Sequence, residues 1–151
     1  MHDVQIHCVN HRCLDDAAVL FEAQLREHQM APPTDALQEA IRSVIDNPSY
    51  GFVLLGTAPD GAAVGVAYAS SLLSFEHGGV SGWLEELYVT PAWRGRGIGS
   101  RLLQEVVKMA RELGWRALDL EVDVAHERAI PLYLRHGFHP HARSRFFLEL
   151  K

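Results

Sequence analysis

A glycine-rich turn between a strand and a helix constrains this chain more than any other stretch of its sequence. The turn lies within residues 84–113, which read LEELYVTPAWRGRGIGSRLLQEVVKMAREL. The β-branched and aromatic residues up to Val89 predict a strand, and this strand ends at Thr90-Pro91 because proline donates no ladder hydrogen bond. Beyond the turn, apolar residues recur at steps of three and four as far as Leu113, which predicts an amphipathic helix.

The turn itself, with the pattern Arg-x-x-Gly-x-Gly over residues 94–99, has the features of a diphosphate site. Its glycines let the backbone turn tightly and approach a ligand closely. The first turn of the following helix adds N–H groups at the positive end of the helix dipole. The pattern fits neither the P-loop, which ends in Gly-Lys-Ser/Thr, nor the dinucleotide fold, which uses Gly-x-Gly-x-x-Gly. A diphosphate outside those two folds is therefore the predicted ligand.

Composition narrows the class of protein. With 151 residues, we expect one domain over residues 1–151. The net charge of −5 disfavours nucleic acid as a partner and suits a cationic substrate. No apolar run reaches membrane-spanning length, and the first ten residues lack the pattern of a signal peptide, so we expect no membrane partner and a cytoplasmic location. The two cysteines, Cys8 and Cys13, are expected to be reduced.

The remaining stretches alternate between strand and helix patterns. Strands are expected at about residues 4–9, 52–56, 63–73, 84–89 and 117–122, with a last pair around Phe138 and Arg145 to Leu150. Helices are expected at about residues 14–26, 34–46, 98–113 and 128–136. The predicted class is α/β, or α+β by some schemes, with a mixed, mostly antiparallel sheet of six to seven strands flanked by about four helices.

Two motifs resemble the signatures of a known family. The first is Leu87-Tyr88-Val89 followed by Arg94-x-x-Gly97-x-Gly99, and the second runs from Ala129 through Tyr133 to Gly137-Phe138. In these motifs and in the order of its elements, the chain resembles the GNAT superfamily of acyl-CoA-dependent N-acetyltransferases. The specific part of the resemblance covers residues 84–138, whereas the N-terminal third matches only in element order.

The resemblance implies acetyl-CoA as co-substrate. Its pyrophosphate would rest on the amides from Gly95 to Ser100, and its amide-rich pantetheine arm would pair with the strand backbone like an extra strand. The cofactor-binding residues implied in this way are Leu87, Tyr88, Val89, Arg94, Gly95, Arg96, Gly97, Ile98, Gly99, Ser100, His126 and Ala129. His126 stands where many relatives have asparagine, so a hydrogen bond from that amide to the pantetheine arm must come from an imidazole or be lost. No histidine or cysteine group has zinc-site spacing, and no metal is expected.

The chemistry that the resemblance implies is attack of a neutral amine on a thioester. Because an alkylamine is protonated near neutral pH, with a pKa of about 10.4 for lysine, a base is required. Glu85 and Glu86 are adjacent on a predicted strand, so they should point to opposite faces and only one should face the substrate. Resemblance to the polyamine-acetylating branch favours Glu85 as a water-assisted base or amine-binding carboxylate, with Glu86 second. Tyr133, by the same resemblance, would protonate the departing thiolate of coenzyme A.

The leading prediction is thus an N-acetyltransferase that acts on a small cationic or amino-acid-like amine. A peptide or protein N-terminal acetyltransferase is a second possibility. A non-catalytic acyl-CoA-binding module, which His126 would permit, is a third. A homodimer through the C-terminal strands is common in the resembling family and is a possible assembly here.

Overall fold

The computed structural model describes residues 3–150. The chain divides into two compact units with the bounds Met1–Glu121 and Val122–Lys151. We refer to them as the sheet unit and the C-terminal unit, and each is described by itself. The prediction of one domain over residues 1–151 stays a prediction.

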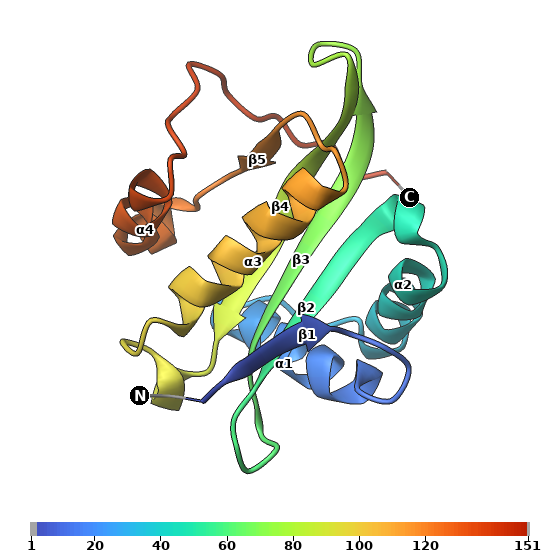
Figure 1. Ribbon diagram of the computed structural model, residues 1–151, viewed down its shortest axis with the longest axis vertical. Coiled ribbons are helices and arrows are strands. Elements are labelled where there is room, and N and C mark those ends of the chain that lie inside the picture. Colours follow the sequence, from blue (N-terminus) through green and yellow to red (C-terminus); the bar gives the residue numbers. More distant parts are fainter. Residues whose placement is uncertain (1–2, 151) are drawn as a thin grey trace. The chain divides into compact units, whose positions relative to one another are not determined.

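The sheet unit is built on one five-stranded sheet with the order β1-β2-β3-β4-β5 (Figure 1). The strands are β1 (Gln5–Cys8), β2 (Gly51–Thr57), β3 (Ala63–Ser74), β4 (Gly79–Val89) and β5 (Leu118–Leu120). The first four pair antiparallel, and β5 runs parallel to β4 because α3 carries the chain back across the sheet. The mixed, mostly antiparallel α/β sheet is confirmed.

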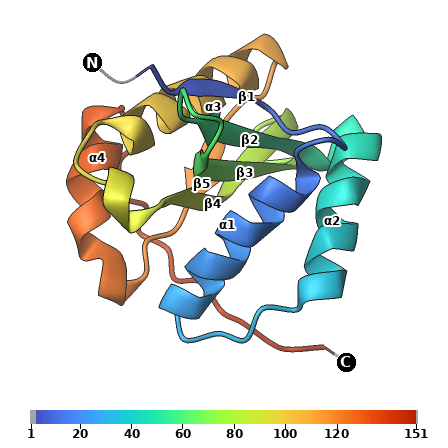
Figure 2. The ribbon, with the colours of Figure 1, turned by 90° about the horizontal axis from the view of Figure 1, so that it is seen from below.

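Helices cover both faces of this sheet. The helices of the sheet unit are α1 (Leu14–Glu27), α2 (Thr34–Asp46) and α3 (Ile98–Glu112). Figure 2 shows α1 and α2 on one face and α3 on the other. Between α1, α2 and the strands lies a buried apolar cluster that includes Phe21, Ile41, Val66 and Tyr88. Burial of these side chains fixes α1 and α2 against one face of the sheet.

Two glycines in the sheet allow side chains from α3 and from the segment after it to pack closely against the strands. A Cβ atom on Gly65 would lie 2.9 Å from a methyl group of Leu102 in α3. On Gly82, it would lie only 2.1 Å from the indole ring of Trp115, which itself packs on Phe52 with 5.4 Å between ring centroids. Any larger residue at Gly82 therefore displaces the indole that follows α3.

The C-terminal unit contains a 3-10 segment, η3 (Val124–Ala129), followed by the short helix α4 (Ile130–Arg135). Pro131 lies in the first turn of α4, where the missing N–H costs no helical hydrogen bond. The helix predicted near residues 128–136 is confirmed.

The two strands predicted around Phe138 and from Arg145 to Leu150 are wrong: within the described part of the chain, no strand follows β5. The sheet therefore has five strands instead of six to seven. The run after Arg145 is apolar at consecutive positions, and Phe146 and Phe147 are 91% and 86% exposed. Apolar and aromatic composition favours a strand only where a neighbouring edge offers backbone partners, and in this structure none pairs with the run.

Two further observations concern residues 3–150. None of their helices combines the length and apolar character needed to cross a membrane. Cys8 and Cys13 are both free thiols.

Replacement of Gly82 by alanine is expected to lower the free energy of unfolding by about 1–3 kcal/mol, because the new methyl group overlaps the Trp115 ring. Urea titration measures this loss, and the double variant Gly82→Ala, Trp115→Leu should recover part of it. Gly56→Ala is the matched control, since a Cβ atom there meets its nearest neighbour at an ordinary 3.4 Å. Equal losses at Gly82 and Gly56 would contradict the packing described.

Candidate active site

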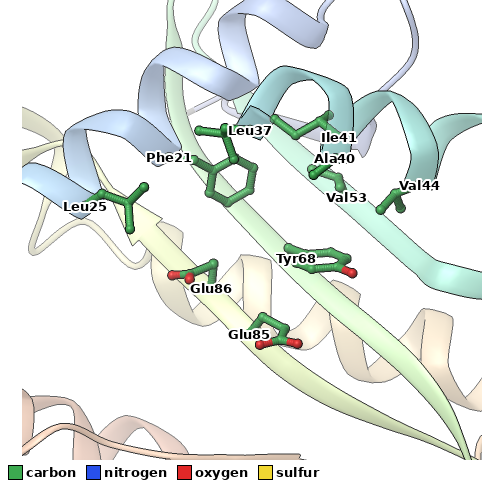
Figure 3. Close-up of a pocket in the computed structure, with 10 residues that line it drawn as sticks. All are labelled: Phe21, Leu25, Leu37, Ala40, Ile41, Val44, Val53, Tyr68, Glu85 and Glu86. Atoms are coloured by element: carbon green, nitrogen blue, oxygen red, sulfur yellow. The ribbon is translucent and has the colours of Figure 1, made fainter. Parts of the chain in front are cut away.

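A β-bulge in β4 determines where the two predicted carboxylates point. Tyr68 on β3 lies opposite Glu86, whereas the next residue, Ala69, lies opposite Leu84. Glu85 is therefore an extra residue without a partner position on β3, and the bulge breaks the alternation of faces along β4. As a result, Glu85 and Glu86 both line one pocket (Figure 3). The prediction that they point to opposite faces was wrong, because it assumed a regular strand.

This pocket, which we call the α1–α2 pocket, lies between α1, α2 and the strands β2, β3 and β4. Its volume is about 280 Å³. The residues that line it are Phe21, Leu25, Leu37, Ala40, Ile41, Val44, Val53, Tyr68, Glu85 and Glu86. The polar groups all come from β3 and β4, whereas α1, α2 and β2 contribute only apolar side chains (Figure 3).

The two carboxylates differ in their surroundings. Burial, reinforced by the negative charge of Glu85, raises the pKa of Glu86 to about 7. Glu85 is exposed, and one of its oxygens accepts a hydrogen bond from the Ser70 hydroxyl at 2.9 Å. Burial and the same Glu85 charge also raise the pKa of Tyr68. The pocket thus places a carboxyl group that exchanges its proton near neutral pH next to a second carboxylate that can attract a cation.

The other side of β4 presents a backbone edge that no strand covers beyond residue 84, and we call it the open edge. The Thr90 N–H donates to the Val64 carbonyl at 2.9 Å, so alternate residues before Thr90 bond to β3 and the residues between them do not. By this alternation, the backbone groups of Leu87 and Val89 point away from β3. Strand β5 pairs only with residues 82–84 of β4, so it does not reach them. The outward carbonyls already accept from side chains, that of Leu87 from Gln24 and that of Val89 from Arg94. An amide-rich ligand can therefore pair with β4 through the N–H groups of Leu87 and Val89.

Gln24 of α1 reaches this open edge, and sequence reasoning missed it. Its Nε2 donates to the Leu87 carbonyl at 3.4 Å. The side chain is only 7% exposed, and its Oε1 has no hydrogen-bond partner within the described structure. A buried amide oxygen without a donor costs about 1–3 kcal/mol, and an amide N–H lying along the edge would satisfy it. The pantetheine arm of coenzyme A carries such groups. In the sequence, Gln24 could have been noticed as a polar residue three positions after Phe21, on the apolar face of a predicted helix.

The glycine-rich turn leads directly into the N-terminus of α3. Gly95 and Gly97 have φ angles of 75° and 80°, which glycine adopts without strain. A Cβ atom at either position would meet no atom within 4 Å, so the space above the turn is open. The Arg101 N–H donates to the Gly97 carbonyl, which leaves the N–H groups of Ile98 and Gly99 directed out of the helix end. Arg96 adds positive charge there, stacked 4.7 Å from the Trp93 ring centroid. These residues fit a diphosphate.

Arg94 has a different environment from the one the sequence suggested. Its Nη2 contacts the two carboxylate oxygens of Glu27 at 3.0 and 2.8 Å, and its Nε donates to the Val89 carbonyl at 2.8 Å. The Tyr88 hydroxyl donates to the same carboxylate at 2.7 Å, and the guanidinium lies 5.3 Å from the Tyr88 ring centroid. Although burial alone would raise it, these hydrogen bonds lower the pKa of Glu27. Arg94 therefore ties the turn to α1 and β4, and Glu27 is a second residue that sequence reasoning missed.

Three predicted site residues belong to the C-terminal unit, and their roles stay predictions. Tyr133 is half-buried, with its ring edge-to-face on Phe138 at 5.9 Å between centroids. Burial raises the pKa of Tyr133, which keeps its phenol protonated. His126 lies in η3, and Ala129 occupies the N-cap position of α4.

The described residues contain no group of three or more His, Cys, Asp or Glu side chains placed to hold a metal ion.

Comparison with known proteins gives consistent matches. The sequence model of the Acetyltransferase (GNAT) family matches residues 15–138. The aminoglycoside N(6')-acetyltransferase type 1 of Stenotrophomonas maltophilia is 34% identical over 128 residues, which cover 83% of this chain and 82% of that protein.

Solved structures show the same fold. An integron cassette protein, HFX_CASS3, from the mobile metagenome of Cole Harbour Salt Marsh is 26% identical with a TM-score of 0.87, over 97% of this chain and 91% of that one. The aminoglycoside N-acetyltransferase AAC(6')-Iy in complex with CoA is 21% identical with a TM-score of 0.84, over 99% of this chain and 96% of that one.

The variant Glu27→Gln tests how Arg94 acts. Loss of a negative charge near a polyanion site would by itself strengthen the binding of coenzyme A. If Glu27 instead holds Arg94 and the turn in place, its loss should weaken binding by about 3- to 5-fold, the scale of a partly exposed ion pair. Calorimetric titration with coenzyme A measures the change, with Glu22→Gln on the same helix as the control. Tighter binding by Glu27→Gln would show that Arg94 serves the phosphates directly.

Proposed function

The chain belongs to the GNAT family of acetyltransferases, as an acyl-CoA-dependent enzyme, and from this premise we propose that it transfers the acetyl group of acetyl-CoA directly to a primary amine of a small molecule. One observation carries the proposal. The bulge in β4 places two carboxylates, one with a pKa near 7, in a pocket on the strand whose next residues offer an open backbone edge. The similarity to an aminoglycoside N-acetyltransferase supports a small-molecule acceptor.

Binding of acetyl-CoA, in this proposal, uses the open edge and the turn. The outward N–H groups of Leu87 and Val89 donate to carbonyl oxygens of the pantetheine arm, and Gln24 Oε1 accepts one of its amide protons. The amides from Gly95 to Ser100 receive the pyrophosphate at the positive end of α3. Arg96 adds charge, while Arg94 keeps the turn in position through Glu27.

The amine reaches the site as an ammonium ion, which Glu85 attracts and Glu86 deprotonates. The neutral nitrogen then attacks the thioester carbonyl carbon, so that a C–N bond forms and the C–S bond breaks. Tyr133 gives its proton to the departing thiolate. Two protons leave the nitrogen: the first passes through Glu86 to solvent, and the second restores Tyr133.

This assignment reverses the order of preference that the sequence suggested for the two carboxylates. Glu86 is the more buried of the pair and exchanges its proton near pH 7, which suits a base at neutral pH. Glu85 is exposed and bound by Ser70, which suits attraction of the cation. The cytoplasmic location and the homodimer stay predictions.

The Glu86→Gln variant tests the base. Because the carboxyl group accepts a proton only when it is ionised, kcat/KM of the unmodified enzyme should rise with pH through about 7 and then level off until the amine itself titrates near 10. In the variant, kcat/KM should be about 100-fold lower and should no longer rise with pH through this range. Thiol release from acetyl-CoA with a panel of amines measures both, and Glu39→Gln on the surface of α2 is the control. No turnover with any amine would refute the proposed function.

The Tyr133→Phe variant separates catalysis from mere binding of acyl-CoA. We expect kcat to fall by roughly 10- to 100-fold. This is less than the usual effect of removing a general acid, because a thiolate is a fair leaving group and depends less on protonation. The affinity for coenzyme A should stay within about twofold of the original. Tyr50→Phe, at an exposed tyrosine, is the control. An unchanged kcat would favour a binding module, and a large loss of affinity would contradict the role given to the hydroxyl.

A further inference from the structure

The α1–α2 pocket has a charged side and an apolar side, and this separation indicates the kind of amine that it binds. Its charged groups are confined to one side, where β4 contributes Glu85 and Glu86 (Figure 3). The opposite wall consists of apolar side chains from the two helices, among them Phe21, Leu37 and Ile41. The described residues that line this pocket include no further charged side chain, and Tyr68 supplies the only other polar one.

We propose that the acceptor is a primary amine with a single cationic nitrogen on a compact apolar body, such as an arylalkylamine or an alkylamine. This inference rests on the proposed transfer to an amine and specifies its substrate class. With the nitrogen between Glu85 and Glu86, the remainder of the molecule lies against α1 and α2, where only apolar surface meets it. Burial of the apolar body against this wall then adds to the binding free energy that the carboxylates contribute through the ammonium group.

A polycationic or polyhydroxylated acceptor fits this wall poorly. Each additional ammonium or hydroxyl group would lose its hydration against apolar side chains such as Phe21 and Val44 and would gain no partner there. The relative from Stenotrophomonas maltophilia bears the name of an aminoglycoside acetyltransferase, and aminoglycosides carry several ammonium and hydroxyl groups. The composition of this pocket therefore separates this chain from that substrate class.

The size of the pocket sets the size of the apolar body. Its volume of about 280 Å³ is slightly below the range of about 300–1,000 Å³ typical of pockets for drug-sized ligands. A single aromatic ring on a short alkyl chain, or an unbranched chain of comparable length, is the scale of molecule that such a pocket accommodates.

Steady-state acetylation of a matched set of amines tests the proposal. Along propylamine, butylamine, pentylamine and hexylamine, we expect kcat/KM to rise by about 3- to 4-fold per methylene until the pocket is filled, and 2-phenylethylamine should be accepted at least as well. Spermidine and kanamycin should be poor acceptors. Higher kcat/KM for spermidine or kanamycin than for hexylamine would overturn the inference while leaving the proposed function intact. No acetylation of any of these amines would refute the proposed function instead.

A variant that fills the pocket from an exposed position makes the test independent of folding. Ala40 lines the pocket on α2 yet is exposed, so Ala40→Leu should leave the fold intact. It should lower the ratio of kcat/KM for 2-phenylethylamine to kcat/KM for propylamine by at least 10-fold. Ala36→Leu, at an exposed position of the same helix that does not line the pocket, is the matched control. Equal effects of Ala40→Leu on both amines would overturn the inference.

Discussion

The bulge at Glu85 lets strand β4 present two different surfaces within a few residues, one for each ligand of the proposed reaction. A regular strand would send adjacent carboxylates to opposite faces, and one of them would point away from the pocket. The extra residue turns both Glu85 and Glu86 toward the α1–α2 pocket, while Leu87 and Val89, only a few residues later, keep their backbone groups on the open edge. In the proposed reaction, a few residues of one strand would therefore set the distance between the acceptor and the acyl donor.

Helix α1 joins the two halves of the site. Its Phe21 and Leu25 form part of the apolar wall of the pocket, and its Gln24 and Glu27 contact the edge of β4 and the glycine-rich turn. The polar contacts of α1 are few but specific, because each involves a group that would otherwise be buried or charged without a partner. A shift of α1 would alter the pocket and the turn together.

The sequence was informative where local chemistry decides the structure. Helix α3 and the glycine turn follow from spacing and from the backbone freedom of glycine, and the GNAT family followed from two motifs. Three features depended on contacts that the sequence does not show. The bulge arises from the register between β3 and β4. The strands expected around Phe138 and after Arg145 do not form within the described residues, because composition alone does not supply the backbone partners of a ladder. The contacts of Gln24 and Glu27 join groups more than 60 residues apart in the chain. Gln24 alone left a trace, as a polar residue on an apolar helix face.

A crystal structure with coenzyme A and 2-phenylethylamine tests the central claim most directly, because it locates both ligands relative to β4. The account predicts pantetheine hydrogen-bonded to Leu87 and Val89, phosphates on the amides of Gly95 to Ser100, and the amine nitrogen within hydrogen-bonding distance of Glu86 with its ring against α1 and α2. Coenzyme A bound away from that edge, or an amine nitrogen distant from both Glu85 and Glu86, would contradict it.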